Sequence, residues 1–326
     1  MRIAVIGTGA VGLRAGRQLH ESDAVTSVAV VARNPARAEW AANELGSKGE
    51  RGAWPAVARD VDAVVLAVPE HHQVDMARVA LGDGAHVVST AASIDAVDGI
   101  VALDGRARAA GLSAVAGAAM SPGLSCLLAA LAARGVDVVE EIHVAKAGTG
   151  GPACARATHA SLRGPAASWR DGRWQSELAG SGRELCFFPE PVGGVDCYAT
   201  SSAEATLLTS AFPSARRITA RLAATRRDKA TTWLPMLRPP HPEGLIGAVR
   251  VEIRGWVDGR AVTHVVGAVD RPAIVAGTLS ALVAVAAVRG DLQRGAGGLG
   301  VLAGSSGDLL AQLSERGVKV AAFAGS

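Results

Sequence analysis

The 326-residue chain has few aromatic residues, few lysines and few cysteines. Phe, Trp and Tyr make up 3% of the sequence, yet four of the six Trp residues fall between residues 169 and 256. That cluster favours either a shaped pocket or ordinary core packing in this region. The four cysteines form no Cys-x-x-Cys pair and no zinc-type spacing with histidine. We therefore expect neither a disulfide framework nor a metal site.

Charge of one sign and long apolar runs are also scarce. The formal net charge is +3, and no basic run is long enough to suggest nucleic-acid binding. Arg14 and Arg17 interrupt the first apolar stretch, so we expect no secretory signal peptide. The longest apolar segment, residues 274–288, is too short for a membrane span and predicts a buried helix. The default location is the cytoplasm, with neither nucleic acid nor membrane as a partner.

What the sequence does contain is a glycine motif directly after its first apolar run, residues 2–6. Gly7, Gly9 and Gly12 fit the pattern Gly-x-Gly-x-x-Gly. In a dinucleotide-binding strand–turn–helix unit, the first glycine allows the tight turn and the second lets the backbone approach a pyrophosphate. The third lets the helix pack closely on the sheet. The same predicted cofactor-binding turn includes Thr8, Ala10 and Val11, at the positive end of the following helix.

The residue type at the end of the second apolar run bears on the choice of cofactor. An acidic residue that binds the ribose 2′-hydroxyl of NAD is expected about 20 residues beyond the glycines. Arg33 holds that place here, and Arg37 follows one turn later. A planar guanidinium suits a 2′-phosphate, so the sequence predicts NADP (NADPH) in preference to NAD. The alternative interpretation is a glycine-rich turn followed by two solvated arginines.

The pattern of the chain changes along its length, and the chain is longer than one typical core. The first third alternates apolar strands with helices, whereas residues 249–253 and 261–269 flank a hairpin turn at Asp258-Gly259. We predict an α/β fold, with a Rossmann-type doubly wound parallel sheet domain plus an α+β substrate and dimerisation domain whose sheet is mostly antiparallel. The predicted dinucleotide-binding domain is residues 1–122, with 290–326 returning to it, and the substrate-binding and dimerisation domain is residues 123–289.

Loops that follow the carboxyl ends of parallel strands line the cofactor crevice of such a sheet. Val68 and Pro69 follow one predicted strand, and Ser89 ends the next. Gly117 and Pro122 follow a further predicted strand. We therefore expect these five residues to border the nicotinamide end of the cofactor.

Three further segments carry a family resemblance: Gly117-Ala-Ala-Met-Ser121-Pro122-Gly123, the Gly150-Gly151-Pro152 loop, and the C-terminal hairpin at 249–269. With the glycine motif, they resemble the saccharopine dehydrogenase-like family of NAD(P)-dependent oxidoreductases, in its saccharopine reductase and carboxynorspermidine dehydrogenase branch. The resemblance implies hydride transfer between a nicotinamide and an imine carbon, at a C–N bond to an amino acid, and dimerisation through the sheet of the second domain. The family often has Asp in place of Ser121 and an acidic residue near Ser89. Those positions face the substrate in the family, so the same substrate is not implied.

Hydride transfer needs a proton donor or acceptor beside the reacting carbon. Two candidates are His159, on the helix predicted after the Gly-Pro pair, and Lys146, one of four lysines and the neighbour of a glycine loop. His143 near Lys146, and His241 between two prolines, are alternatives. For each of these residues, a surface or core position without a catalytic role is the competing interpretation.

An amino-acid substrate carries a carboxylate, for which an arginine fork is expected. Arg226 and Arg227 lie in the densest charge cluster and are the first candidates, with a solvated turn as the alternative. Backbone N–H groups of Gly150 and Gly151 could also receive an anion, and His241 completes the predicted substrate-binding set. The arginines that compete with this pair are Arg156, Arg163 and Arg183.

The residues and the resemblance together predict an NADPH-dependent oxidoreductase that transfers a hydride at a C–N (amine or imine) centre of an amino-acid-derived substrate. Its expected partners are this small molecule and a second copy of the chain in a homodimer. Two alternatives stay open. One is an NADP-dependent reductase of an aldehyde or ketone, and the other is a non-catalytic NADPH-binding protein.

Overall fold

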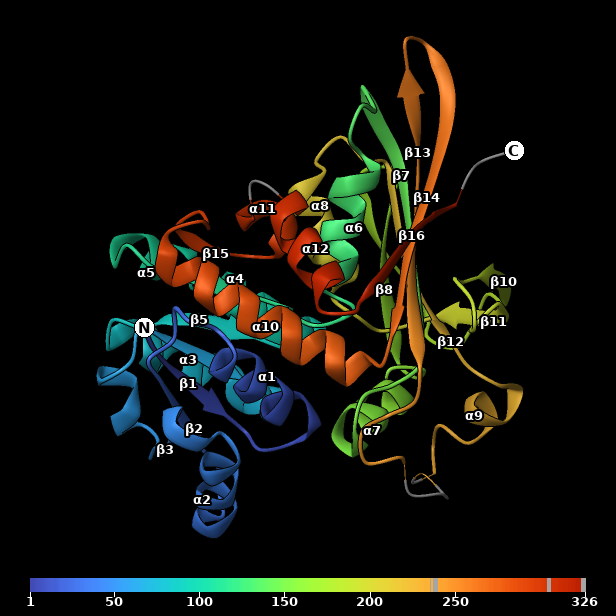
Figure 1. The fold of residues 1–326 in the computed structure, drawn as a ribbon. Coiled ribbons are helices and arrows are strands. Elements are labelled where there is room, and N and C mark those ends of the chain that lie inside the picture. Colours follow the sequence, from blue (N-terminus) through green and yellow to red (C-terminus); the bar gives the residue numbers. More distant parts are fainter. Residues whose placement is uncertain (235, 237–239, 304–305, 324–326) are drawn as a thin grey trace.

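The computed structural model describes residues 1–234, 236, 240–303 and 306–323. Within these residues the chain forms two sheets that stand side by side (Figure 1). The first has seven strands in the order β15-β6-β5-β4-β1-β2-β3, and every pair in it is parallel. Its strands are β1 (Arg2–Ile6), β2 (Ser27–Val31), β3 (Gly49–Arg51), β4 (Ala63–Leu66), β5 (His86–Ser89), β6 (Ser113–Val115) and β15 (Gly295–Gly297).

The central strands are short apolar runs because both faces of the parallel sheet are covered by helices. Every residue of β4 and β5 is buried, and in β1 and β2 only the first residue is accessible. The connections hold α1 (Ala10–His20), α2 (Pro35–Glu44), α3 (Gln73–Gly82), α4 (Ile94–Val101) and α5 (Asp104–Ala109), with short 3₁₀ turns η1 (Gly46–Lys48), η2 (Ala56–Arg59) and η3 (Glu70–His72). The alternation of strand and helix is that of a Rossmann-type unit.

The second sheet is mixed and has nine strands. Its main path is β10-β11-β12-β7-β13-β14-β16, with β8 pairing both β12 and β9. Only the β12–β7 pair is parallel among these pairings. Its strands are β7 (Val138–Ala147), β8 (Pro165–Arg170), β9 (Arg173–Leu178), β10 (Glu184–Phe187), β11 (Gly194–Ala199), β12 (Arg217–Ala223), β13 (Gly247–Val257), β14 (Arg260–Asp270) and β16 (Lys319–Phe323).

Helices cover one face of this second sheet and close one of its ends. On the face, α6 (Leu124–Ala132) contacts β13 and β14, and α8 (Glu204–Ala211) contacts β8 and β12. Two more helices, α11 (Leu299–Leu302) and α12 (Ser306–Glu315), pack on α6. At the end nearest the first sheet's helix α1 lies α7 (Pro152–Ala160), and α9 (Arg226–Ala230) lies below β12 in Figure 1.

A long helix, α10 (Pro272–Arg289), joins the two parts by packing along α1 and against β4 and β5. By length and composition alone α10 could cross a membrane, but 78% of its most apolar window is buried inside the protein. Gly277 allows the close approach to α1, since a Cβ there would lie 2.6 Å from the Cβ of Arg14. The predicted buried helix at 274–288 is thus a core helix.

The predicted fold class is confirmed, because a parallel Rossmann-type sheet stands beside a mixed, mostly antiparallel one. The tail needs a correction. Strand β15 is an edge strand of the parallel sheet, but β16 pairs antiparallel with β14 in the second sheet. β16 thereby covers the backbone edge that β14 would otherwise leave unpaired. The expectation that all of 290–326 returns to the first domain is therefore wrong for β16, and the domain limits stay a prediction.

Candidate cofactor and substrate site

The glycine turn between β1 and α1 is closed by contacts that only glycine permits. Gly7 has φ of +115°, and a Cβ there would lie 2.3 Å from the carbonyl oxygen of Ala67. A Cβ on Gly12 would lie 1.9 Å from the carbonyl oxygen of Gly7. These two glycines therefore hold the first helix against the turn and against the end of β4, whatever is bound.

Gly9 differs from its two neighbours in the motif. Its φ of −78° and ψ of −178° are open to any residue, and a Cβ there would meet nothing within 4 Å. It is the N-cap of α1 but supplies no side-chain cap, so the first N–H groups of the helix face open space. A backbone cradle that is empty at Gly9 and rigid at Gly7 and Gly12 fits a diphosphate.

Arg33 and Arg37 lie beside this cradle. Arg33 follows the end of β2, the strand that pairs with β1, and its side chain is exposed. Arg37 lies in the first turn of α2, where its Nη2 donates to the carbonyl oxygen of Thr8 at 3.4 Å and its guanidinium lies over the ring of Trp40 at 4.6 Å. Neither guanidinium has a carboxylate partner among the described residues. Both can therefore receive an anion from the cofactor side of the turn.

A cavity of about 670 Å³ opens where the carboxyl ends of the parallel strands meet the second sheet. From the parallel sheet it receives Val68 and Pro69 after β4, and Thr90 after β5. From the second sheet it receives Lys146 at the end of β7, with α7 forming another wall. Segments from the first and the middle third of the chain thus meet at one site.

The charge of this cavity is mainly positive. Lys146 on β7, and Arg156 and Arg163 on and just after α7, line it without a hydrogen-bond or ion-pair partner among the described residues. A fourth cation, Arg221, is paired through Nε with Glu184 at 2.6 Å. The three unpaired cations are available to an anionic ligand.

Two acids line the cavity, Glu70 and Glu204, and the sequence did not single out Glu204. It is 1% exposed at the start of α8, accepts a hydrogen bond from the Ser121 hydroxyl, and accepts one from Ser125 Oγ at 2.9 Å. Burial raises the pKa of this carboxyl, while the two serine hydroxyls and the charge of Lys146 oppose the shift. A single Glu in a Ser-rich loop has no motif that could have marked it.

Several residues predicted to border the cofactor shape the cavity from beneath it. Ser89 is fully buried, and its hydroxyl donates to Gln73 Oε1 at 2.6 Å and accepts from the Ala91 N–H. A Cβ on Gly117 would lie 2.7 Å from Cγ of Pro122, so this pair closes the turn that presents Ser121. Neither Ser89, Gly117 nor Pro122 lines the cavity itself.

Glu70 also acts on the cavity wall. Its two carboxylate oxygens accept from the N–H groups of Ala92 and Ser93, each at 2.9 Å. These bonds tie the turn after β4 to the turn after β5. The edge of the parallel sheet that faces the second sheet is therefore rigid before any ligand binds.

The structure brings only one of the two acid–base candidates into the cavity. Lys146 lines it, whereas the ring of His159 faces away and places Nε2 3.1 Å from the Thr231 carbonyl oxygen. The alternative, His143, lies on the other face of β7 from Lys146 and contacts Thr219 at 2.8 Å. Among these candidates, Lys146 is the one that can reach a ligand in the cavity.

The predicted carboxylate binders are also divided. Gly150 lines the cavity, but Arg226 and Arg227 on α9 are exposed and lie outside its lining. His241 is exposed as well, and it does not line the cavity either. Gly151 is wedged between domains, since a Cβ there would lie 2.8 Å from the Pro242 carbonyl oxygen and 3.1 Å from Ala10 Cβ. Of the three competing arginines, Arg156 and Arg163 line the cavity and Arg183 does not.

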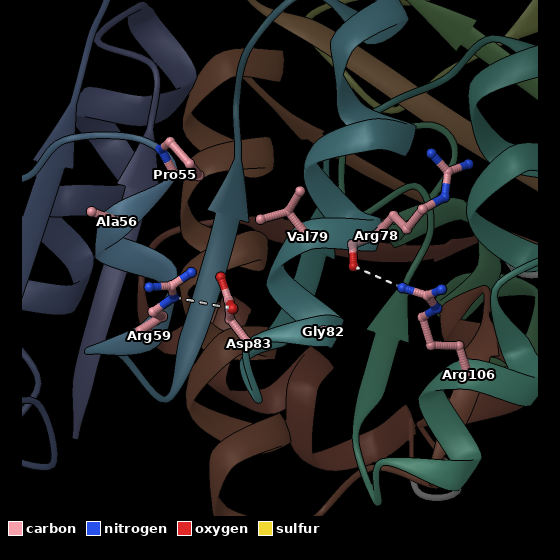
Figure 2. A pocket seen from close by; sticks show the side chains of 8 residues that line it. All are labelled: Pro55, Ala56, Arg59, Arg78, Val79, Gly82, Asp83 and Arg106. Atoms are coloured by element: carbon pink, nitrogen blue, oxygen red, sulfur yellow. Dashed lines mark hydrogen bonds and ion pairs between the residues drawn. The ribbon is translucent and has the colours of Figure 1, made fainter.

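A second hollow, of about 550 Å³, lies at the opposite edge of the parallel sheet (Figure 2). Arg59 there pairs with Asp83 at 3.4 Å, and Arg106 donates to the carbonyl oxygen of Arg78 at 3.4 Å. The residues around it precede β4, β5 and β6, whereas cofactor loops follow the strands. This hollow is therefore separate from the candidate site.

Comparisons with known proteins agree with this geometry. Residues 1–89 match the model of a family described as an oxidoreductase family with an NAD-binding Rossmann fold. Among solved structures, apo saccharopine dehydrogenase (L-Glu forming) from Saccharomyces cerevisiae is similar over 99% of this chain and 100% of that chain, with a TM-score of 0.71 and 15% identity. The C. glutamicum DAP dehydrogenase in complex with DAP is similar over 98% and 99%, with a TM-score of 0.53 and 15% identity. No curated protein matches the chain significantly.

These matches confirm the expected resemblance to saccharopine dehydrogenase-like oxidoreductases at the level of fold. The match over residues 1–89 covers β1 to β5 and therefore the glycine turn and the end of β4. The N-terminal part of the chain is therefore a Rossmann unit, and its first 89 residues are similar to a family described as NAD-binding.

Proposed function

We propose that the protein is an NADPH-dependent oxidoreductase that transfers a hydride at a C–N centre of an amino-acid-derived substrate. The observation that carries the proposal is the cavity at the carboxyl edge of the Rossmann sheet, where Lys146 lies among unpaired cations. The structural neighbours support this substrate class, since one is a saccharopine dehydrogenase and the other was bound to DAP.

In this proposal one group of residues binds the phosphates of the cofactor and another borders its nicotinamide. Gly9 and the first N–H groups of α1 receive the diphosphate, and Arg33 with Arg37 receives the 2′-phosphate. Val68 and Pro69 border the nicotinamide, which supplies the hydride when it is bound. The rigid turns held by Glu70 then keep the reacting carbon at a fixed place beside it.

The substrate is held and protonated by side chains from the second sheet. Arg156 and Arg163 bind its carboxylate, because charge-assisted pairs with guanidinium are the strong ones. Lys146 donates a proton to the substrate nitrogen as the hydride reaches the carbon, and takes it back in the opposite direction. The same residues can therefore support reduction of the imine and oxidation of the amine.

The test is an assay of NADPH oxidation with a panel of 2-oxo acids, each with and without an amino acid or ammonia. Turnover that needs the amine supports the proposal. Equal turnover without any amine would instead establish the reductase of an aldehyde or ketone. NADPH binding with no turnover across the panel would favour the non-catalytic alternative and contradict the proposal.

The assembly and the location remain expectations from the sequence. A homodimer would use the face of the second sheet opposite α6, where Glu141, Arg254 and Glu252 alternate in charge across neighbouring strands. In a two-fold dimer the same patch of both copies meets, and a patch that carries both signs of charge allows such a contact. We propose this face for the dimer contact and the cytoplasm for the location.

Cofactor preference gives a separate prediction. Arg33→Asp is expected to weaken NADPH binding by about 10- to 100-fold, or about 1–3 kcal/mol, with a much smaller effect on NADH. The reason is that a carboxylate would repel the 2′-phosphate and could accept a ribose hydroxyl. Fluorescence titrations with both nucleotides measure the effect.

Arg59→Asp makes the same charge change at the opposite edge of the sheet and is the matched control. It should leave both affinities unchanged. NADPH affinity that is the same in Arg33→Asp and in the native protein would remove Arg33 from the site.

A further inference from the structure

A fully buried carboxyl lies at the wall of the cavity without a cation in contact. Glu204 is 1% exposed, and its polar contacts among the described residues are two hydroxyls, from Ser121 and from Ser125 at 2.9 and 3.0 Å. No nitrogen of Lys or Arg lies within ion-pair distance of it in the described part of the chain. A buried charge in such surroundings is costly, so the neutral acid is favoured.

The two serines differ in what they can reach. Ser121 lines the cavity, whereas Ser125 lies on α6 and is completely buried beneath it. Glu204 also lines the cavity, and Ser121 is the one of its two hydroxyl partners that does so as well. Ser125 donates to the same carboxyl but does not line the cavity. The Ser121 hydroxyl can carry a proton to the cavity, whereas the Ser125 hydroxyl only stabilises the carboxyl by a hydrogen bond.

The other ionisable groups around Glu204 come from α6, α7, β7 and β12, and one of them, Lys146, opposes a proton on it. Lys146 faces it across the cavity from β7, and its charge favours the ionised carboxylate. Cys126 on α6 stays a neutral thiol, because burial and then the charge of Glu204 raise its pKa to about 12. Arg221 on β12 is neutralised by Glu184. Arg156 and Arg163 reach the same cavity from α7.

We infer that Glu204 is a proton reservoir for the site, connected to the cavity through the Ser121 hydroxyl. The inference rests on the proposed function. In the neutral acid the Glu204 O–H donates to Ser121 Oγ, the reverse of the bond that the carboxylate accepts, and the Ser121 proton is then directed into the cavity. When Lys146 has given a proton to the substrate nitrogen, Glu204 passes its proton to Ser121 Oγ. Ser121 releases its own proton into the cavity, where the Lys146 amine takes it up. Glu204 is left as a carboxylate and regains a proton from solvent, so the charge and the atoms balance.

The arrangement explains how the site can work with a serine at position 121. The acid function is supplied from α8, 83 residues away in sequence, and the serine connects it to the substrate. Glu204 does not touch the substrate in this scheme, and it acts through Ser121. It is therefore a positioning and relay residue rather than one in contact with the reacting atoms.

The first test is made on the cofactor-free protein by infrared spectroscopy. A carboxyl band in native protein that persists above the ordinary glutamate pKa of about 4.3, and is missing in Glu204→Gln, is expected. Ser125→Ala removes a hydrogen bond that stabilises the carboxylate, so the band should persist to still higher pH. A native spectrum identical to that of Glu204→Gln over this range would overturn the inference.

The second test compares turnover in the matched serine variants, using the best substrate pair from the amine panel. Ser121→Ala and Glu204→Gln are expected to lower kcat by about 10- to 100-fold with KM changed less than about 3-fold. Ser314→Ala, at an exposed serine of α12 outside the cavity lining, is the matched control and should keep kcat within about 3-fold. Native turnover that survives in Ser121→Ala would overturn the relay alone. No turnover in the native protein would overturn the proposed function and the relay with it.

Discussion

Lys146→Met is expected to lower kcat by about two to four orders of magnitude while NADPH binding stays unchanged. Methionine keeps most of the length of the side chain but can neither donate nor accept the substrate proton. The effect is large because Lys146 alone among the acid–base candidates from the sequence lines the cavity. Initial rates over a range of pH, with a parallel NADPH titration, separate the loss of chemistry from a loss of binding.

Two controls make this result specific. Lys229→Met makes the same chemical change at a lysine that lies over the Tyr198 ring at 4.6 Å and outside the cavity lining, so it should leave kcat within about 2-fold. His159→Ala tests the competing candidate, whose ring contacts the Thr231 carbonyl oxygen instead of the cavity. A large loss of kcat in His159→Ala, with normal turnover in Lys146→Met, would exchange their roles and contradict the assignment made here.

Local chemistry explains why the cofactor half of the site was visible in the sequence. The turn after β1 is formed by residues 7–12, and each glycine requirement arises within this turn or against the residue that follows β4, the strand paired directly with β1. The strand that presents Arg33 pairs directly with β1. A motif of this kind is contiguous in sequence, so its spacing alone carries the geometry.

The substrate half was harder to predict because its residues meet only through tertiary packing. Ser121 and Glu204 come from different elements, and neither lies in a pattern that predicts the contact. The choice between Arg156 and Arg226 depended on which helix faces the cavity. Charge density favoured Arg226, but its helix, α9, contributes no residue to the cavity lining. A cluster of charged residues in a sequence is as typical of a solvent-exposed turn as of a binding site.

The same distinction applies to the tail. Alternating strand and helix predicted the parallel sheet, yet β16 is a short apolar strand that either sheet could have accepted. The strand partner of β16 depended on which sheet had an unpaired edge strand, and β14 had an unpaired backbone edge along residues 265–269. Edge pairing depends on the whole assembled sheet and is not encoded in the strand itself.

Two alanine variants of the glycine turn are expected to have large effects of different kinds, one on stability and the other on NADPH binding. Gly12→Ala is expected to destabilise the protein by about 3 kcal/mol, because the new Cβ would lie 1.9 Å from a backbone oxygen that cannot rotate away. Intrinsic helix propensity alone favours Ala over Gly by about 1 kcal/mol, so a net loss reports the clash. Urea unfolding of the cofactor-free protein measures it.

Gly9→Ala should do the reverse. Its backbone conformation suits alanine and its Cβ would meet no protein atom within 4 Å, so stability should change by no more than about 1 kcal/mol, the scale of an N-cap effect. The methyl group would instead occupy the space through which a diphosphate must approach the backbone, and NADPH affinity should fall at least about 10-fold. If Gly9→Ala bound NADPH as tightly as the native protein, the diphosphate could not lie on this turn. Because Gly12→Ala acts through the folded chain and Gly9→Ala through the ligand, opposite outcomes in the two assays are what a cofactor cradle requires.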